Sequence, residues 1–418
     1  MIRIEQKRHI KAEVVVPGSK SLTQRALVAA ALAEGRSILN GALISEDTSL
    51  MMEGLQRFGA GIKPEAGRIM VDGTGGIIKA LDEPLYMGNN GTGMRFLTAV
   101  SSLGPAPVIL TGSERMKDRP IQDLLDGLES LGVKAESISQ TGCPPVKVSP
   151  ASGLAGGRIR MKGSISSQFI SAILLAGPYA RESIRLELEG EPVSVPYISM
   201  TLKVMSDFGV SVGNNDYRDF EIPLGRYRSR EYEIEGDVSN ASYFWAAAAV
   251  TGGSVCVSNI FADSVQGDIA FVDILKEMGC TVEKGRGGIL VSGPERLRSV
   301  QVDMKKWPDV VPTLAVVASQ AEGETIIRNV SHLRVKETDR LHAVAVELEK
   351  IGTEVDELPD GLIIRKGSAR PAVIETYNDH RMAMSFAVAG LVLPGLSIAG
   401  EECVAKSFPN FWEVFEQL

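Results

Sequence analysis

The chain has 418 residues, of which 44% are hydrophobic and 23% charged, and this length and composition are typical of a globular protein with two domains. The formal net charge of −8 argues against a surface built mainly for nucleic acid, although a basic cleft would still suit a small anionic ligand. The four cysteines form no CxxC pair and the four histidines show no ligand spacing, so we expect neither a disulfide framework nor a metal site. Residues 1–10 lack an apolar signal segment, and no apolar run reaches the roughly 18 residues of a membrane span, which predicts a cytoplasmic protein without membrane contact.

Short Ala-rich segments recur along the chain, and each begins after a polar or glycine-containing turn. They are apolar on nearly every side, which predicts buried helices rather than surface helices. Alanine allows such helices to approach one another closely. The segments are residues 21–32, 93–100, 167–176, 239–250, 311–318 and 379–388.

A second, amphipathic helix follows each of these segments, and five of the six end in an apolar residue and a glycine. Glycine just past the last helical turn is a typical C-cap. The sixth helix, near residues 411–418, runs to the end of the chain with no strand after it. The five glycines are Gly59, Gly132, Gly209, Gly279 and Gly352.

Strand-like runs between these helices complete a β-α-β-α-β-β unit that occurs six times. The pattern predicts an α/β (α+β) fold with buried helices and outer sheets, in two domains of three units each. We expect an N-terminal domain at residues 17–230 and a second domain at residues 231–418. A strand within residues 1–10 would supply what the last unit lacks, so residues 1–16 are expected in the second domain.

Charged and hydroxyl side chains are concentrated in the turns that precede the most apolar helices. Each turn by itself is equally well explained as an ordinary helix cap with surface charges. Their recurrence favours a different interpretation, because desolvating so many charges is costly unless they line a shared, water-filled cleft between the domains. The turns lie at residues 17–21, 88–95, 116–121, 163–168, 307–309, 334–340, 377–381 and 406–409.

The most charged of these turns is residues 334–340, which separates a strand-like run from a helical run. Thr338 or Asp339 is expected to cap the helix, with Arg340 in its first turn. Lys336, Arg340 and the helix N-terminus would together bind a phosphate or carboxylate. A solvated, salt-bridged surface turn is the alternative for this stretch taken alone.

Taken together, these turns resemble the 5-enolpyruvylshikimate-3-phosphate (EPSP) synthase family from residues 17–21 through to residues 406–409. The most specific matches are RVKETDR at 334–340 and YNDHRMAM at 377–384. The resemblance implies two domains of three βαβαββ units, an arrangement described as an inside-out α/β barrel. It also implies transfer of the enolpyruvyl group of phosphoenolpyruvate to the 5-hydroxyl of shikimate 3-phosphate with release of phosphate. This reaction belongs to the shikimate pathway to chorismate and the aromatic amino acids, needs no cofactor or metal, and is expected here of a monomer.

The resemblance assigns site residues, which are expected to meet in the cleft between the domains. Glu337 would protonate the methylene carbon of phosphoenolpyruvate, and Asp309 would accept the proton of the attacking hydroxyl. The catalytic group is Lys20, Asp309, Glu337 and His380. The shikimate 3-phosphate group is Lys20, Ser21, Arg25, Ser166, Ser167, Gln168, Ser194, Tyr197, Asp309 and Lys336. The phosphoenolpyruvate group is Lys20, Asn89, Gly91, Arg119, Gln168, Glu337, Arg340, Arg381 and Lys406.

Some residues depart from the family pattern, and two other functions remain as alternatives. His332 stands where many members carry Asn, which leaves open one contact with shikimate 3-phosphate. Asn90, Gly93 and Phe96 also differ, on the helix whose start shapes the phosphoenolpyruvate pocket, which leaves open sensitivity to glyphosate, an inhibitor that competes with phosphoenolpyruvate. The first alternative is the sister enolpyruvyl transferase acting on UDP-N-acetylglucosamine, but its typical loop cysteine is missing from residues 113–119. The second is a non-catalytic homologue, against which the retained Lys20, Asp309 and Glu337 argue.

Overall fold

The computed structural model describes residues 1–150 and 152–418, and the chain divides into two compact units. We refer to Gly18–Ile234 as the central unit, and to Met1–Pro17 with Glu235–Leu418 as the terminal unit, since it contains both chain ends. The boundary expected at residue 230 falls just before strand β14 (Glu231–Glu233), which pairs in parallel with β3 (Glu34–Asn40) of the central unit. The central unit therefore extends through this strand.

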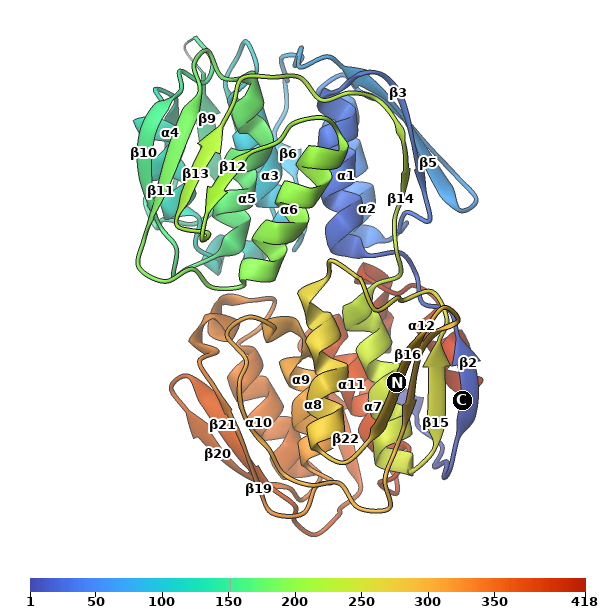
Figure 1. The fold of residues 1–418 in the computed structure, drawn as a ribbon. Coiled ribbons are helices and arrows are strands. Elements are labelled where there is room, and N and C mark those ends of the chain that lie inside the picture. Colours follow the sequence, from blue (N-terminus) through green and yellow to red (C-terminus); the bar gives the residue numbers. More distant parts are fainter. Residues whose placement is uncertain (151) are drawn as a thin grey trace. The chain divides into compact units, whose positions relative to one another are not determined.

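Helices fill the interior of the central unit, and its strands lie on the outside (Figure 1). Three sheets have the strand orders β14-β3-β5-β4, β6-β7-β9-β8 and β10-β11-β13-β12. Its helices are α1 (Lys20–Leu32), α2 (Glu46–Arg57), α3 (Gly91–Ser101), α4 (Gln122–Ser130), α5 (Ser167–Ala176) and α6 (Val195–Asp207). Its other strands are β4 (Gly61–Glu65), β5 (Arg68–Thr74), β6 (Leu85–Tyr86), β7 (Val108–Thr111), β8 (Lys134–Ser137), β9 (Val146–Ser149), β10 (Gly157–Lys162), β11 (Ile184–Glu189), β12 (Gly213–Asn215) and β13 (Asp219–Ile222).

The terminal unit repeats this arrangement, with sheets β16-β17-β15-β2, β18-β19-β21-β20 and β1-β23-β22 (Figure 1). Its helices are α7 (Val238–Thr251), α8 (Ala270–Glu277), α9 (Val311–Ala318), α10 (Arg340–Lys350), α11 (His380–Gly390) and α12 (Phe411–Glu416). Its strands are β1 (Ile2–Arg3), β2 (Lys11–Val14), β15 (Ser254–Val257), β16 (Thr281–Gly285), β17 (Gly288–Ser292), β18 (Gln301–Asp303), β19 (Glu324–Arg328), β20 (Glu354–Leu358), β21 (Gly361–Arg365), β22 (Ala372–Glu375) and β23 (Leu396–Ala399).

Each four-stranded sheet contains one parallel pair followed by an antiparallel hairpin, as in β10-β11-β13-β12. The N-terminal segment contributes to two different sheets. Ile2–Arg3 pairs with β23 and completes the last repeat, whereas Lys11–Val14 pairs in parallel with β15. The strand expected within residues 1–10 is therefore present as Ile2–Arg3, and the structure adds a second strand, Lys11–Val14, just beyond it. Among the described residues all the sheets are open, so the mixed α/β fold with buried helices is confirmed, but the strands form no closed barrel.

The Ala-rich helices are buried along almost their whole length. In α1 every residue from Leu22 to Leu32 is buried, and α7, α9 and α11 are covered in the same way. Polar side chains cap five of the six helices of this type, so the polar turns read from the sequence serve as helix N-caps. The caps are Ser19, Asn90, Ser166, Asp237 and Asp379. The five glycines after the second helices have φ between 80° and 110°, which agrees with their expected C-cap role.

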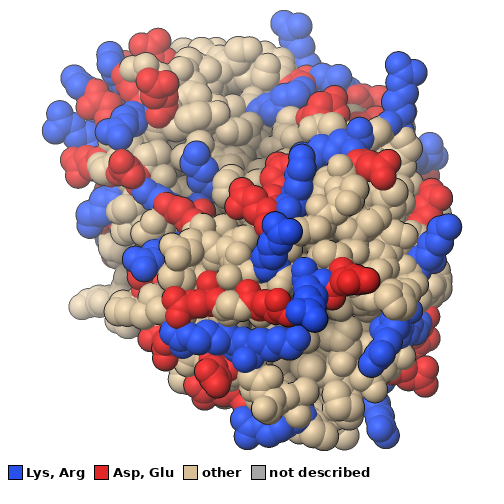
Figure 2. Space-filling view, turned by 60° about the horizontal axis from the view of Figure 1, so that its bottom comes forward, with Lys and Arg blue, Asp and Glu red and all other residues tan. Residues whose placement is uncertain are grey.

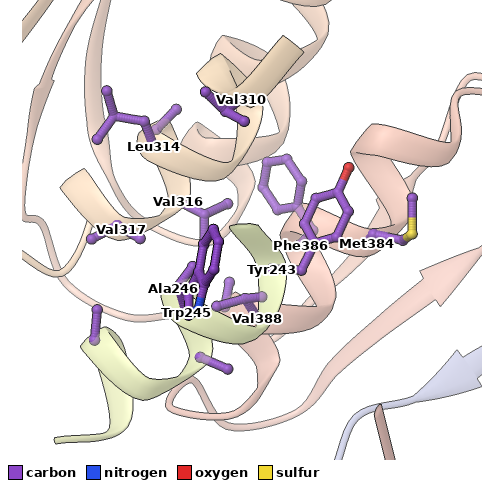
Figure 3. Packing of buried hydrophobic residues seen from close by; sticks show 14 of the residues in the cluster. Tyr243, Trp245, Ala246, Val310, Leu314, Val316, Val317, Met384, Phe386 and Val388 are labelled. Atoms are coloured by element: carbon purple, nitrogen blue, oxygen red, sulfur yellow. The ribbon is translucent and has the colours of Figure 1, made fainter. Parts of the chain in front are cut away.

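Three buried helices, α7, α9 and α11, contact one another in the core of the terminal unit (Figure 3). Trp245 of α7 lies beside Val316 of α9, while Tyr243 points toward α11. Trp245 is fully buried, and its indole N–H donates to the carbonyl of Ile289 at 3.1 Å. The core therefore holds α9 and α11 in place, and candidate site residues lie at the N-terminal ends of these two helices, namely Asp309, His380 and Arg381.

The surface carries both signs of charge. On the face shown in Figure 2, Lys and Arg side chains lie beside Asp and Glu side chains in mixed rows. Exposed pairs such as Arg365 with Glu324 at 2.6 Å add little to stability, because water screens them. Within residues 1–150 and 152–418, no helix is both long and apolar enough to span a membrane.

Candidate functional site

Arg340 lies at the centre of a buried charge cluster in the terminal unit. It is the first residue of α10, its side chain is 2% exposed, and Asp339 caps the helix by accepting from the N–H of His342. Its Nε donates to Asp379 at 2.7 Å, and its two Nη atoms donate to Asp309 at 3.2 Å and to Glu337 at 2.8 Å. A single guanidinium thus joins carboxylates from three turns. The alternative of a solvated surface turn at residues 334–340 is excluded for this arginine.

Asp309 lies between two arginines. It belongs to the 3-10 turn Pro308–Val310 before α9, and Nη2 of Arg381 donates to its second oxygen at 2.7 Å. Burial acts to raise the pKa of Asp309, but Arg381, Lys336 and Arg340 outweigh it and hold the pKa well below its usual range. The carboxylate is therefore ionised at neutral pH.

Glu337 bridges two cations that approach from different segments. Oε2 accepts from Arg340, and Oε1 lies 3.5 Å from Nζ of Lys406. Lys406 ends the 3-10 turn Glu401–Lys406, and its side chain is 6% exposed. Because Glu337 and Asp309 both bind Arg340, the structure brings the predicted acid and base into one cluster.

The turn before α11 supplies Asp379 and the side chains that follow it. Asp379 is fully buried, accepts from the backbone N–H of Arg381 at 3.0 Å and also binds Arg340. His380 is buried, with Nδ1 3.7 Å from Oδ1 of Asp379. Nη1 of Arg381 lies 3.5 Å from the hydroxyl oxygen of Tyr243. Asp379 thereby orients both arginines of the cluster.

His332 lies near this cluster, in the 3-10 turn Ser331–Val335 before Lys336. Burial, Lys336 and Lys305 lower its pKa from 6.5 to about 4, while Asp309 acts in the opposite direction. The folded protein thus holds this imidazole neutral at pH values where a histidine of the unfolded chain is charged.

We expect this histidine to reduce stability in mild acid. Between its unfolded and folded pKa values the unfolded state binds more protons, so stability is lost as the pH falls from about 6.5 toward about 4. The melting temperature of His332→Asn should therefore fall less than that of the wild type between about pH 7 and about pH 5. His342→Asn, which changes a histidine whose side chain is 63% exposed, is the control. Equal pH dependence in the two variants would contradict the assignment.

In the central unit, Lys20 is tied to the turn before α3. Its Nζ lies 3.0 Å from Oδ2 of Asp47, and both side chains are largely buried. Asn90 caps α3 and donates from Nδ2 to the backbone carbonyl of Asp47 at 2.7 Å. Asp47 therefore connects the start of α1 with the glycine-rich turn, two segments that sequence reasoning treated separately.

Arg25 is a buried cation one turn further along α1. Its guanidinium donates to neutral oxygens, namely Thr201 Oγ1 at 2.8 Å and the carbonyls of Ser21 and Tyr197, and it lies over the ring of Phe96. Burial lowers its pKa to about 10, although Tyr197 acts in the opposite direction. Arg25 therefore remains charged at neutral pH and would attract an anion.

The glycine-rich turn holds Arg119. Nη1 of Arg119 donates to the carbonyl of Asn89 at 2.9 Å and to Oδ1 of Asn89 at 3.0 Å. Gly91 begins α3 directly against this guanidinium, since a Cβ there would lie 2.4 Å from Nη2 of Arg119. In α5, Gln168 donates to the hydroxyl of Thr92 at 3.2 Å. Asn89, Gly91, Arg119 and Gln168 are thus joined through α3.

The hydroxyl-bearing residues lie at the starts of α5 and α6. Ser166 caps α5 by accepting from the N–H of Gln168, and Ser167 is the first residue of the helix. Ser194 precedes α6 with φ 54°, a left-handed conformation that is uncommon for a non-glycine residue. Tyr197 contributes its carbonyl oxygen to Arg25.

Sequence reasoning missed several carboxylates that hold the proposed residues in place. Asp47 stands in the first turn of α2, where an acid is the ordinary complement to a helix N-terminus and gives no sign of a lysine partner. Asp379 was named in Sequence analysis only as part of the motif at 377–384, and its contact with Arg340 was not predicted. Asp268 is buried and accepts from the hydroxyl of Ser239, and burial together with Asp309 raises its pKa. No sequence pattern distinguishes it from the helix-start acids elsewhere in the chain.

The chain is similar to one family of known proteins over nearly its whole length. The model of the family described as EPSP synthase (3-phosphoshikimate 1-carboxyvinyltransferase) matches residues 4–415. A 3-phosphoshikimate 1-carboxyvinyltransferase of Trichormus variabilis is 44% identical over 411 residues, which cover 98% of this chain and 96% of that protein. One of Sulfurovum is 45% identical over 424 residues, covering 100% of this chain and 99% of that protein.

Solved structures are similar over the same length. An EPSP synthase of Acinetobacter baumannii superposes with a TM-score of 0.82 at 28% identity, covering 99% of this chain and 97% of that one. An enolpyruvyl transferase of Streptomyces tendae has a TM-score of 0.79 at 20% identity, covering 100% of this chain and 96% of that one, which shows a shared fold.

Proposed function

The chain belongs to the EPSP synthase (3-phosphoshikimate 1-carboxyvinyltransferase) family, and on this premise we propose that it transfers the enolpyruvyl group of phosphoenolpyruvate to the 5-hydroxyl of shikimate 3-phosphate and releases phosphate. The observation that carries the proposal is the buried cluster in which Asp309 and Glu337 share Arg340. An acid and a base held at fixed separation by one cation suit a reaction that adds one proton and removes another.

In the proposed mechanism Glu337 protonates the methylene carbon of phosphoenolpyruvate, which leaves oxocarbenium character at C2. The 5-hydroxyl of shikimate 3-phosphate attacks C2, and Asp309 accepts the hydroxyl proton. The resulting tetrahedral intermediate then returns a proton from the new methyl group to ionised Glu337 and expels phosphate, which takes up the proton that Asp309 had accepted. The departing phosphate and the carboxylate would be stabilised by Arg340, Arg381 and Lys406. The negative charges of phosphoenolpyruvate would offset these cations and so favour proton uptake by Glu337.

Residues of the central unit are proposed to hold both substrates. Buried Arg25 has neutral partners and remains charged, which supports a role in binding the phosphate of shikimate 3-phosphate. Lys20 and Gln168 are assigned to both substrates, and Arg119 with Asn89 and Gly91 to phosphoenolpyruvate. The remaining assignments are Ser21, Ser166, Ser167, Ser194, Tyr197 and Lys336 for shikimate 3-phosphate and His380 for catalysis.

Gly91→Ala should weaken binding of phosphoenolpyruvate. The added methyl group would lie 2.4 Å from Nη2 of Arg119, so the guanidinium must move away from its position against Asn89. We expect the KM for phosphoenolpyruvate to rise about 5- to 30-fold, the range of a displaced charged hydrogen bond, with the KM for shikimate 3-phosphate nearly unchanged. Gly225→Ala, whose Cβ would meet only Val210 at 3.6 Å, is the control. Equal KM values in the two variants would remove Arg119 from this role.

The acceptor distinguishes this proposal from the sister reaction. The purified protein should release phosphate from phosphoenolpyruvate when shikimate 3-phosphate is added, and should release none with UDP-N-acetylglucosamine. If phosphate is released with UDP-N-acetylglucosamine but not with shikimate 3-phosphate, the assignment of the acceptor is overturned. If phosphate is released with neither acceptor, a non-catalytic homologue is favoured. We further propose that the enzyme acts in the cytoplasm as a monomer. Its molecular mass from scattering in solution would test the monomeric state. An inhibition assay would show whether glyphosate competes with phosphoenolpyruvate.

A further inference from the structure

Two consecutive residues at the start of the segment 377–381, which we call the site segment, adopt a left-handed backbone. Tyr377 has φ 53° and Asn378 has φ 54°, between β22 and α11. A left-handed tyrosine is uncommon, and such conformations persist only where the surrounding structure holds them. The next residue is Asp379, which caps α11 and binds Arg340. The backbone of the cluster therefore depends on whatever fixes this turn.

The turn is held by a buried carboxylate on α10. The hydroxyl of Tyr377 donates to Oε1 of Glu347 at 2.7 Å, and the side chain of Glu347 is fully buried. The other oxygen, Oε2, accepts from the backbone N–H of Glu375 at 3.2 Å, which fixes the end of β22. Lys350 lies 2.8 Å from Oε1 and balances the charge. The carboxylate thus binds the end of β22 and the first of the two left-handed residues.

Glu347 and Arg340 lie two turns apart on one face of α10. Arg340 contacts the site segment at Asp379, at 2.7 Å, and Glu347 contacts it at Tyr377, also at 2.7 Å. The helix therefore fixes the segment at two points. Loss of the second point would leave Asp379, and with it the guanidinium of Arg381 on Asp309, on a turn with fewer contacts, among them the N–H of Asp379 on the carbonyl of Thr376 at 2.8 Å and the hydroxyl of Thr376 on the carbonyl of Gly400 at 3.2 Å.

We propose that Glu347 and Tyr377 are positioning residues for the reaction, holding the turn in the backbone conformation that directs Asp379 and Arg381 into the charge cluster. The inference rests on the proposed function, because Arg340 and Arg381 are its phosphoenolpyruvate ligands. Neither Glu347 nor Tyr377 touches the reacting atoms. Their effect is expected on phosphoenolpyruvate and not on shikimate 3-phosphate.

Tyr377→Phe tests the proposal, because it removes one hydroxyl from a side chain that is 42% exposed and so leaves the core intact. We expect the KM for phosphoenolpyruvate to rise about tenfold, as for a lost hydrogen bond to a carboxylate, with the KM for shikimate 3-phosphate within about twofold. Tyr217→Phe is a matched control. Tyr217 also has a positive φ, 55°, follows a second left-handed residue, Asp216, and accepts a hydrogen bond from Ser199 through its hydroxyl.

A second variant and a second measurement separate positioning from folding. Glu347→Gln keeps an acceptor for Tyr377 and should change the KM for phosphoenolpyruvate less than Glu347→Ala does. Hydrogen exchange of the amides at 379–382 should be faster in Tyr377→Phe than in Tyr217→Phe. A lowered melting temperature with an unchanged KM for phosphoenolpyruvate would overturn the inference. Should the wild type release no phosphate, the proposed function fails, and exchange at 379–382 alone decides whether the turn is held as described.

Discussion

Replacing Glu337 by glutamine is expected to reduce turnover by about 10²- to 10⁴-fold, the usual contribution of a general acid, while both KM values stay within a few-fold. Glutamine keeps the size of the side chain and an acceptor for Arg340 at 2.8 Å, so the cluster should remain assembled. It cannot deliver a proton to the methylene carbon of phosphoenolpyruvate. Steady-state kinetics with each substrate varied in turn give the turnover number and the two KM values separately.

The matched control for this variant is Glu357→Gln. Glu357 lies in the same unit, also binds an arginine, Arg334 at 2.6 Å, and has no assigned role in the reaction. Turnover of this control should equal that of the wild type. Near-normal turnover of Glu337→Gln would remove Glu337 from the role of acid, whereas a large rise in either KM would mean that it serves mainly in binding.

Arg340→Met should be the most destabilising substitution in the charge cluster. Three carboxylates depend on this guanidinium, and the side chains of Asp309, Glu337 and Asp379 are only 17%, 10% and 0% exposed. Removing one partner of a buried ion pair leaves uncompensated charge, at a cost of about 3–5 kcal/mol. Urea unfolding measures this loss as a lower midpoint. The loss should shrink as the pH falls toward about 4, because the buried carboxylates left without the guanidinium take up protons in the variant, whereas Asp309 of the wild type, whose pKa is held well below its usual range, stays ionised.

Arg365→Met serves as the control for this stability measurement. Arg365 also binds two carboxylates, Glu324 at 2.6 Å and Asp356 at 2.8 Å, but on the surface, where water screens the pairs. Its unfolding midpoint should match that of the wild type at every pH. A similar midpoint for Arg340→Met would mean that the cluster contributes no net stability.

The helices could be predicted from sequence because each carries a local signal. The apolar runs at 167–176 and 311–318 coincide with α5 and α9, since an all-round apolar surface and a preceding turn fix both type and position. The resemblance to the EPSP synthase family is likewise confirmed. What sequence could not give is the pairing of distant strands. Nothing in Lys11–Val14 or Glu231–Glu233 identifies the parallel partners β15 and β3, because neighbours in a sheet depend on the path of the whole chain.

In the candidate site, too, local features could be predicted from the sequence, whereas contacts between distant residues could not. Charged turns revealed Asp309, Glu337 and Arg340 as candidates, and the structure adds that they share one buried guanidinium. Partners such as Asp47 for Lys20 and Glu347 for Tyr377 were not predictable, because an acid on an amphipathic helix is usually solvated. The roles of the individual site residues remain predictions, which the variants above test.

The most direct test of the central claim is to identify the product that the wild type makes from shikimate 3-phosphate and phosphoenolpyruvate in D₂O. Addition and elimination pass through a methyl group at C3, so the account predicts an enol ether at the 5-oxygen of the ring with solvent deuterium in its vinyl methylene group. NMR of the isolated product locates both. An enol ether without deuterium would contradict the protonation step assigned to Glu337, and the absence of any enol ether on the 5-oxygen would contradict the proposed function itself.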